Sequence, residues 1–209
     1  MTQNTALRAP AHHGNNGRRS PGRPRSEQSH RAILRSTLKL LRKKGGFLEL
    51  TIEAIAADAN VSKATVYRWW PSKAALVADA FAESSEQELQ FLDTGSVVGD
   101  MSLQMRRVVR VFRSERGKIV AALLAGGQSD PELIRAFRER FLWPRRQQAY
   151  ITLQRGIHRG ELPRGTNKDL ILDSLYGPIY MRFLIRHDEL TEDFADQLCA
   201  LVLNGRRRP

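Results

Sequence analysis

Apolar residues recur at intervals of three and four along most of this chain, and no segment alternates strictly between apolar and polar residues. The first periodic segment, 27–45, places four apolar side chains on one face and ends at two successive glycines: Ile33, Leu34, Leu38 and Leu41, then Gly45 and Gly46. Spacing of three and four is typical of amphipathic helices, whereas half-buried strands alternate. The pattern therefore predicts an all-α protein with about nine helices.

Two short helices joined by a tight turn are predicted within residues 51–73. Thr51 and Ser62 stand where each helix begins, and their hydroxyls suit the N-cap position. Asn60 lies between them and tolerates the left-handed conformation that a sharp turn requires. The segment therefore predicts a helix-turn-helix, with Val66 as the inward residue of its second helix.

The second of these helices displays cationic, hydroxyl and aromatic side chains: Lys63, Thr65, Tyr67 and Trp69. The major groove of DNA admits one α-helix and offers base edges and phosphates to such groups. Many helix-turn-helix hairpins in soluble proteins bind nothing, so this spacing alone leaves a purely structural hairpin open.

The net charge of +12 is concentrated at the chain ends and around this motif. Residues 1–25 contribute +5, residues 26–80 contribute +4, residues 81–205 are neutral overall, and Arg206, Arg207 and Arg208 add +3. Binding to a polyanion rewards only the charges that lie near its phosphates. The asymmetry favours nucleic acid over a membrane surface, because the neutral part contains no obvious cationic amphipathic helix.

Residues 1–25 are rich in Gly, Pro, Asn, Ser and Arg and contain almost nothing apolar, so we expect a disordered basic arm. Within it, Gly22-Arg23-Pro24-Arg25 resembles an AT-hook, whose extended arginines lie in a narrow minor groove. Arg23 and Arg25 are the candidates for this contact, and a solvated tail without a specific register is the alternative. The predicted organisation is an arm (1–25), a helix-turn-helix domain (26–72), a helical effector-binding and dimerisation domain (73–205) and a basic tail (206–209).

From Ser29 to about Phe81 the chain resembles the DNA-binding domain of the TetR family of transcriptional regulators. The resemblance rests on the helix at 27–45, on the two helices that follow, and on a fourth helix that opens at Ser72 after Pro71. It also rests on individual residues: Val61, Ser62, Thr65, Val66, Tyr67, Trp70 and Lys73. The family usually has glycine at the position of Asn60, and tryptophan at both 69 and 70 is unusual for it.

The resemblance implies which residues meet DNA. Positions that contact phosphates match Thr51, Tyr67 and Lys73, and positions that meet base edges and adjacent backbone match Ser62, Lys63, Ala64, Thr65 and Trp69. Lys63 is the best candidate for reading guanine, which displays two acceptors in the major groove. Packing within the small domain is the alternative for Trp69, and burial is the preferred interpretation of Trp70.

The rest of the chain is also helical in pattern. Helices are predicted at 72–93, at 100–113, at 119–124 until Gly126-Gly127 interrupts them, from 129 to about 160 with a kink or restart at Trp143-Pro144, at 168–187 and at 191–203. The helix from 129 is expected to open with a cap at Ser129-Asp130 and a proline in its first turn.

The helix at 168–187 is apolar on all sides. Between Leu170 and Ile185, eleven of sixteen residues are apolar or aromatic, so this helix has two faces to cover. The resemblance implies that it pairs with the last helix across a two-fold axis, which makes a homodimer with two readers about one DNA turn apart on a pseudo-palindrome. The predicted interface residues are Leu175, Ile179, Phe183, Phe194, Leu198, Leu201 and Val202. Residues 155–163 and 175–182 also resemble one C-terminal subgroup of the family.

A pocket for a small, largely apolar effector is predicted in the second domain. Its candidate lining residues are Met105, Phe112, Trp143, Tyr150, Tyr180 and Met181. The alternative for each is ordinary core, because aromatics and methionines at helical spacing usually pack. An anionic effector would find cations among Arg113, Arg146 and His158, which are more often surface residues.

Catalysis, cofactors and metals find no support in the sequence. The histidines are scattered, and no metal-ligand spacing appears. Cys199 is the single cysteine, which excludes an intramolecular disulfide and favours a reducing cytoplasm. A buried inert thiol is preferred over redox sensing by Cys199 across a dimer interface. No apolar run approaches the roughly 18 residues of a membrane span.

The sequence therefore predicts a DNA-binding transcriptional regulator, a repressor released from a pseudo-palindromic operator by a small molecule. An architectural DNA-binding dimer without an effector is the alternative, and an enzyme hidden in the helical domain is a third hypothesis. Adding the small molecule separates them, because a regulator releases DNA, an architectural dimer does not, and an enzyme converts the molecule.

Overall fold

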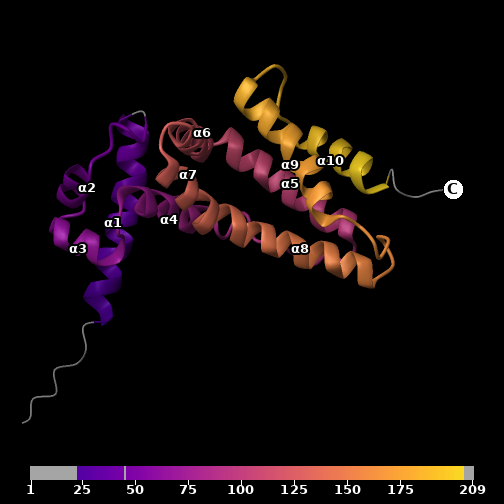
Figure 1. Cartoon of the computed structure of the whole chain (residues 1–209), viewed down its shortest axis with the longest axis horizontal. Helices are drawn as coiled ribbons and strands as arrows, with labels where there is room; N and C mark the ends of the chain where they lie inside the picture. Colours follow the sequence, from indigo (N-terminus) through magenta and orange to yellow (C-terminus); the bar gives the residue numbers. More distant parts are fainter. Residues whose placement is uncertain (1–22, 45, 205–209) are drawn as a thin grey trace, which may run out of the picture.

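The computed structural model describes residues 23–44 and 46–204, and within these ranges all regular structure is helical (Figure 1). The helices near the N-terminus are α1 (Arg23–Lys44), α2 (Ile52–Asp58), α3 (Lys63–Trp69) and α4 (Lys73–Ser85). They are followed by α5 (Val97–Arg113), α6 (Glu115–Gly127), α7 (Pro131–Phe137), a π-helix (Arg138–Leu142), α8 (Trp143–His158), α9 (Lys168–Ile185), α10 (Glu192–Cys199) and a second π-helix (Ala200–Asn204). Because the π-helices join their neighbours without a break, the described chain forms nine continuous helical segments, which confirms the predicted all-α fold.

Helix α1 begins inside the predicted arm. Its first residue is Arg23, so residues 23–25 are helical and lack the extended backbone of an AT-hook. Pro24 is compatible with this start, because the first turn of a helix leaves its N–H groups without intrahelical partners. The predictions for residues 1–22, for the tail 206–209 and for the side chains of Arg23 and Arg25 lie outside the described residues.

The helix-turn-helix forms as the caps predict. The Thr51 hydroxyl accepts a hydrogen bond from the Ala54 amide, and the Ser62 hydroxyl accepts one from the Thr65 amide. Asn60 has a φ of 53°, the left-handed conformation expected at the turn. Short-range sequence signals therefore determine this motif.

Helix α4 is shorter than predicted, because it ends at Ser85 and not near 93. Arginines from other helices donate hydrogen bonds to carbonyls in the last turn of α4 and just after it: Arg116 to Ser84, Arg107 to Gln90 and Arg145 to Leu89. These carbonyls would otherwise accept hydrogen bonds from the backbone N–H groups of a further helical turn. Because the arginines bond to them instead, the helix can end at Ser85. These long-range partners are invisible to a local pattern.

Helices α5 and α6 are longer than predicted. Helix α5 starts at Val97 and not at 100, because the Ser96 hydroxyl caps the Gly99 amide. Helix α6 continues through the glycines that were expected to interrupt it. A Cβ atom on Gly126 would lie 3.0 Å from the Leu133 side chain, and one on Gly127 would lie 3.1 Å from Ile134. These glycines therefore permit a close approach of α7 and do not break the helix.

The irregularity predicted at Trp143-Pro144 takes the form of a π-helical turn. Residues 138–142 connect α7 to α8, and the Trp143 amide donates to the Arg138 carbonyl. The predicted cap at Asp130 is confirmed, because its side chain accepts from two amides of the first turn of α7. The wide turn carries Arg140, Phe141 and Leu142, which become important below.

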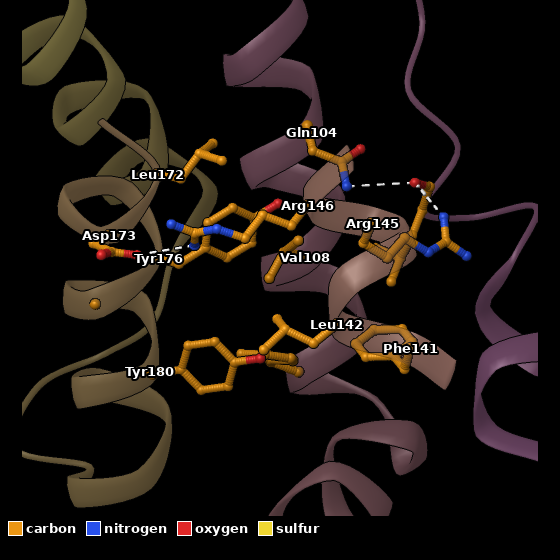
Figure 2. Close-up of a pocket in the computed structure, with 13 residues that line it drawn as sticks. Gln104, Val108, Phe141, Leu142, Arg145, Arg146, Leu172, Asp173, Tyr176 and Tyr180 are labelled. Atoms are coloured by element: carbon orange, nitrogen blue, oxygen red, sulfur yellow. Dashed lines mark hydrogen bonds and ion pairs between the residues drawn. The ribbon is translucent and has the colours of Figure 1, made fainter. Parts of the chain in front are cut away.

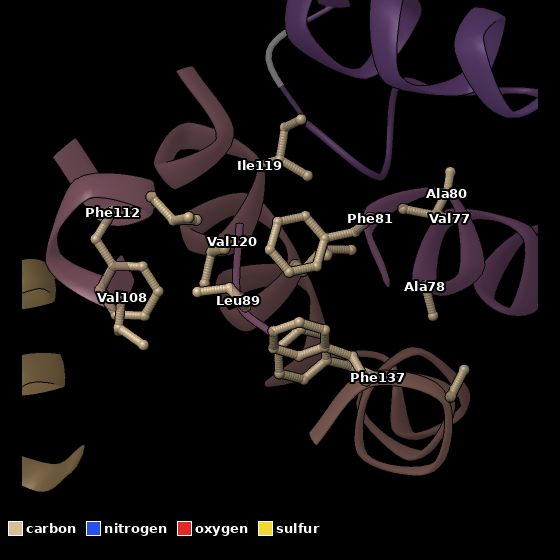
Figure 3. Close-up of a cluster of buried hydrophobic side chains, with 14 of the residues drawn as sticks. Val77, Ala78, Ala80, Phe81, Leu89, Val108, Phe112, Ile119, Val120 and Phe137 are labelled. Carbon is tan, nitrogen blue, oxygen red and sulfur yellow. The ribbon is translucent and has the colours of Figure 1, made fainter. Parts of the chain in front are cut away.

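Helices α1–α3 lie at one end of the molecule and α5 with α8–α10 at the other, with α4 and α7 between them (Figure 1). The junction is an aromatic cluster. The ring centroid of Phe81 on α4 lies 6.3 Å from that of Phe137 and 4.8 Å from that of Phe141. Figure 3 shows Phe81 and Phe137 facing each other between these helices. The two ends are thus joined through one apolar core.

Helix α9 differs from the predicted dimer helix in the face that it exposes. Leu175 and Ile179 are fully buried within the chain and Leu198 on α10 is nearly so. Phe183 stacks within 4.3 Å of Phe112, and Phe194 lies beneath the Arg182 guanidinium. Leu175, Ile179 and Leu198 therefore belong to the core of the chain itself, because periodicity cannot tell which side of an all-round apolar helix faces that core, whereas Leu201 of the predicted interface is 73% exposed. The large apolar residues that stay exposed on α9 and after it are Leu170, Met181, Leu184, Ile185 and Leu201.

Candidate DNA-binding surface and ligand cavity

Helix α3 presents an exposed face that matches the predicted reader. Val66 is buried, whereas the side chains on the opposite side are exposed: Ser62, Lys63, Ala64, Tyr67, Arg68 and Trp69. Thr65 is half-buried, and its hydroxyl lies 2.9 Å from that of Ser62. Arg68 was missed by the sequence interpretation, although its position beside Tyr67 on the outward face was visible in the spacing.

Lys63 forms an exposed ion pair. Its ammonium lies 3.0 Å from a carboxylate oxygen of Glu53 on α2. A backbone hydrogen bond and then Lys63 lower the pKa of Glu53, so the carboxyl is charged. Exposed ion pairs contribute at most about 1 kcal/mol, so the pair positions Lys63 without preventing it from reaching DNA.

Lys73 differs from the expectation of a phosphate contact. Its ammonium donates to the Phe47 and Leu50 carbonyls, at 2.9 Å each, and lies 4.1 Å from the centroid of the Phe47 ring. Burial lowers the pKa of Lys73. The side chain therefore holds the turn before α2 against the start of α4, and the predicted phosphate contact stays a prediction.

The two tryptophans at the end of α3 have different environments. Trp69 is 42% exposed, whereas Trp70 is buried, as the sequence indicated. The ring of His30 on α1 packs against both, with centroid distances of 4.9 Å to Trp69 and 4.7 Å to Trp70. Trp69 therefore packs against α1 and is also partly exposed to solvent.

A hydrogen-bonded chain connects the reader to the second domain. The Trp70 indole donates to Asp79 Oδ2 on α4 at 2.8 Å. The Arg140 guanidinium, in the π-helical turn, donates to the same oxygen at 2.6 Å. Asp79 and Arg140 were not predicted as functional residues, because 61 positions separate them and no short motif contains both.

A cavity of about 360 Å³ lies between α5, α8 and α9. Figure 2 shows side chains from these helices converging on it. Its lining consists of Leu89, Gln104, Val108, Phe112, Phe141, Leu142, Arg145, Arg146, Leu172, Asp173, Tyr176, Gly177 and Tyr180. Most of this surface is apolar, and only a few polar groups interrupt it, as in small-molecule sites generally.

The structure places only two of the six predicted pocket residues in this cavity, Phe112 and Tyr180. Met105 is fully buried core, while Trp143 and Met181 are about half exposed and lie outside the lining. Tyr150 hydrogen-bonds to Asp169 at the surface. The predicted list selected bulky residues by type, whereas the cavity is defined by which helix faces meet.

Of the cations considered for an anionic effector, Arg146 alone lines the cavity. Its guanidinium already pairs with Asp169 and Asp173. His158 contacts Gln154, and Arg113 is exposed. Arg145, which was not predicted, is the second guanidinium in the lining.

Cys199 is fully buried, and burial raises the pKa of its thiol to about 11. A thiol so protected cannot meet its counterpart on the surface of a second copy, which favours the inert interpretation. Within residues 23–44 and 46–204, no helix is long and apolar enough to cross a membrane. The same residues contain no cluster of His, Cys, Asp and Glu that suits a metal ion.

Comparison with known proteins matches both parts of the chain. The family model for bacterial regulatory proteins of the tetR family matches residues 33–80, and the model for the tetracyclin repressor-like C-terminal domain matches residues 91–202. The HTH-type transcriptional regulator YdeS of Bacillus subtilis is 39% identical over 184 residues, which cover 88% of this chain and 92% of that protein.

Two further relatives are similar over most of their length. The crystal structure of the TetR family transcription regulator SCO0332 superposes with a TM-score of 0.75 and 31% identity, covering 87% of this chain and 100% of that one. The DNA-binding transcriptional repressor TetR of Mycobacteroides abscessus is 27% identical over 150 residues, which cover 71% of this chain and 78% of that protein.

Proposed function

The chain belongs to the TetR family of transcriptional regulators, and from that premise we propose that it is a homodimeric repressor that leaves its operator when a small molecule fills the cavity between α5, α8 and α9. The observation that carries this proposal is the physical connection between that cavity and the reader. The turn that lines the cavity with Phe141 and Leu142 also carries Arg140, which is bound through Asp79 to the end of α3.

The reader supplies the contact with DNA. Helix α3 is short, exposed on one side and capped at its start by Ser62, so its first residues can enter a major groove while its amide dipoles face phosphates. Lys63 and Arg68 bring positive charge to this face, and Trp69 brings an apolar surface for a thymine methyl or a sugar. Repression is supported by the relative from Mycobacteroides abscessus, which is described as a repressor.

A second copy would cover the exposed stripe of α9. Leu170, Gly177, Met181 and Leu184 are exposed at spacings of seven, four and three, which places them on one side of the helix. Leu201, at the end of the chain's last helix, is 73% exposed. Contiguous exposed apolar side chains of this kind mark interfaces. Pairing through them gives the two-fold symmetry that a pseudo-palindromic operator requires.

The link between cavity and reader works through α4. A ligand that separates α5, α8 and α9 must move the π-helical turn, because Phe141 and Leu142 form part of the cavity wall. Arg140 on this turn pulls on Asp79, and Asp79 holds the Trp70 indole at the C-terminal end of α3. Displacement of α4 then changes the distance between the two readers of a dimer, and the ligand and the operator each favour a different arrangement.

The test uses the full chain and DNA. Selection from random sequences should return an inverted repeat whose half-sites lie about one helical turn apart, and footprinting beside the protein's own gene should locate the same repeat. A compound that raises the melting temperature of the free protein should also weaken its binding to that repeat. Recovery of a single unrepeated half-site would contradict the dimeric reader. An operator affinity that is unchanged by every stabilising compound would instead favour the effector-independent architectural dimer.

A further inference from the structure

The cavity is small and aromatic. Its volume of about 360 Å³ lies at the lower end of the roughly 300–1,000 Å³ that small-molecule sites occupy. Phe112, Phe141, Tyr176 and Tyr180 contribute rings, and Leu142 and Val108 close the wall between them (Figure 2). A flat ring system stacks on such walls, whereas a long acyl chain exceeds the space.

A buried amide oxygen in this lining is left without a hydrogen-bond partner. Gln104 is 2% exposed, and its Oε1 atom accepts no hydrogen bond. The amide nitrogen has partners: Nε2 donates to the Leu89 carbonyl at 3.4 Å, and the side chain also hydrogen-bonds to the Tyr176 hydroxyl. The contact with Leu89 fixes which end is the amide nitrogen, because the reverse orientation would bring two oxygens together.

The unpaired Gln104 carbonyl indicates which kind of ligand the cavity favours. A buried acceptor without a partner is costly, and native proteins seldom retain one without a reason. The bond to Leu89 is near the long limit for a hydrogen bond, so the amide can rotate toward a donor that enters the cavity. A ligand with a hydroxyl group would satisfy this atom.

The two tyrosines add uncharged hydrogen-bonding groups. Figure 2 shows the Tyr180 hydroxyl directed from α9 toward the side chains of α5 and α8. Among the described residues no group hydrogen-bonds to it, and burial raises the pKa of Tyr180 to about 12. Burial also raises the pKa of Tyr176, beside Gln104. Both phenols therefore stay neutral at physiological pH and can donate to or accept from a ligand.

The charges around the cavity disfavour an ionic ligand. Arg146 is occupied by Asp169 and Asp173, and Arg145 donates to the Leu89 carbonyl at 2.7 Å. Two guanidiniums against the single carboxylate of Asp173 in the lining repel a cationic ligand. A carboxylate is acceptor-only, so it would leave Gln104 Oε1 unsatisfied and place two acceptors together.

We infer that the cavity binds a compact, uncharged aromatic molecule carrying a hydroxyl group, which donates to Gln104 Oε1 while its rings pack between Phe112, Phe141 and Tyr180. This inference names the effector class of the cavity described above, and it rests on the proposed function. Tyr180 then serves as the second polar contact at the other side of the ring system.

Three matched probes test the inference with the full-length protein: 2-naphthol, 2-methoxynaphthalene and 2-naphthoate. They share one ring system and differ in having a donor, a neutral acceptor or an anionic acceptor. Titration calorimetry and quenching of tryptophan fluorescence should give 2-naphthol an affinity about tenfold or more above both others. Equal affinities, tighter binding of 2-naphthoate, or no binding of 2-naphthol at millimolar concentration would overturn the inference.

Variants assign the preference to one atom. Gln104→Leu should abolish the preference for 2-naphthol over 2-methoxynaphthalene and leave both bound. Gln128→Leu is the matched control, because Gln128 is an exposed glutamine at the C-cap of α6 whose Nε2 also donates to a leucine carbonyl, and it should leave the preference unchanged. Circular dichroism shows whether each variant is folded, and Gln104→Asn provides a milder change that shortens the reach of the same carbonyl. A preference that survives in folded Gln104→Leu or Gln104→Asn would contradict the assignment.

The same samples separate this inference from the proposed function. If 2-naphthol binds with the expected preference but leaves operator affinity unchanged, the ligand class is supported and release by the cavity is not. If 2-naphthoate binds more tightly and releases the operator, the regulatory proposal is supported and the ligand class is wrong.

Discussion

The resemblance places two lysines at the DNA surface, and the structure gives them different environments. Both Lys63 and Lys73 occupy positions expected to touch DNA. Lys63 is exposed and forms an ion pair with Glu53, whereas Lys73 donates hydrogen bonds to two backbone carbonyls. Their substitution should therefore change different measurements.

Lys63→Ala should weaken binding to the preferred DNA by roughly 1–3 kcal/mol and relax one base position, if its ammonium reads guanine. Lys118→Ala is the control, because Lys118 forms an equally exposed pair with Glu115 on α6, remote from the reader. Glu53→Gln should tighten binding, since it frees Lys63 and removes a negative charge beside the DNA. Selection from random sequences measures both effects. An unchanged consensus for Lys63→Ala would shift base reading to Thr65 or Trp69.

Lys73→Ala should reduce the free energy of unfolding by roughly 1–3 kcal/mol, because two carbonyls lose their donor and Phe47 loses a cation above its ring. Urea unfolding monitored by circular dichroism gives this value. DNA affinity measured well below the melting temperature should change little. A uniform loss of affinity for all sequences, with stability intact, would restore the phosphate contact that the resemblance implied.

At the scale of helices, local signals located most elements, and distant contacts determined where several of them end. The caps at Thr51, Ser62 and Asp130 are contained in a few neighbouring residues, and each formed as predicted. The end of α4 depends on arginines 17 to 56 positions away, so no local pattern could supply it. Most of the cavity lining was missed for the same reason, because Gln104 and Tyr176 come together only where α5 packs against α9.

The predicted dimer helix, α9, also shows that a local pattern does not identify long-range contacts. The apolar surface on all sides predicts that α9 has two faces to cover, but not which residues belong to which face. Leu175 belongs to the core, and Met181 belongs to the exposed stripe. We therefore expect a charge at Met181, and not one at Leu175, to separate the dimer without unfolding the chain.

Met181→Asp should convert the dimer to monomers while each monomer remains folded, because the new charge would be buried only in the assembled interface. Leu175→Asp should instead unfold the chain, since it places a charge at a fully buried position. Sedimentation velocity reports the oligomeric state, and thermal unfolding reports the fold. Leu48→Asp, at an exposed apolar residue near the reader, is the control and should leave the dimer intact. A dimer that tolerates Met181→Asp would place the interface on another surface.

At the scale of the whole molecule, the reader and the cavity lie at opposite ends of one continuous core. Rigid contact alone transmits nothing, since a ligand shifts an equilibrium only if it binds two arrangements with different affinity. Asp79 is suited to distinguish such arrangements, because one carboxylate oxygen accepts from Trp70 at the end of α3 and from Arg140 at the cavity wall. A movement of the π-helical turn must either carry Asp79 with it or break one of these bonds.

Asp79→Asn should therefore uncouple the two ends without destroying either. The amide oxygen can still accept from the Trp70 indole, but it no longer carries the charge that holds Arg140. Coupling between distant sites typically amounts to about 1–3 kcal/mol, a change in affinity of about 5–150-fold. We expect most of this factor to disappear in Asp79→Asn, so that 2-naphthol binds as before while operator affinity changes little upon its addition.

Asp58→Asn is the matched control, because Asp58 pairs with Lys39 at 2.6 Å entirely within the reader. Since linkage is reciprocal, saturating operator DNA should weaken 2-naphthol binding to the parent protein and to Asp58→Asn, and not to Asp79→Asn. Full release of DNA by 2-naphthol from Asp79→Asn would show that the signal passes through another contact, most directly the packing of Phe81 on Phe137 and Phe141.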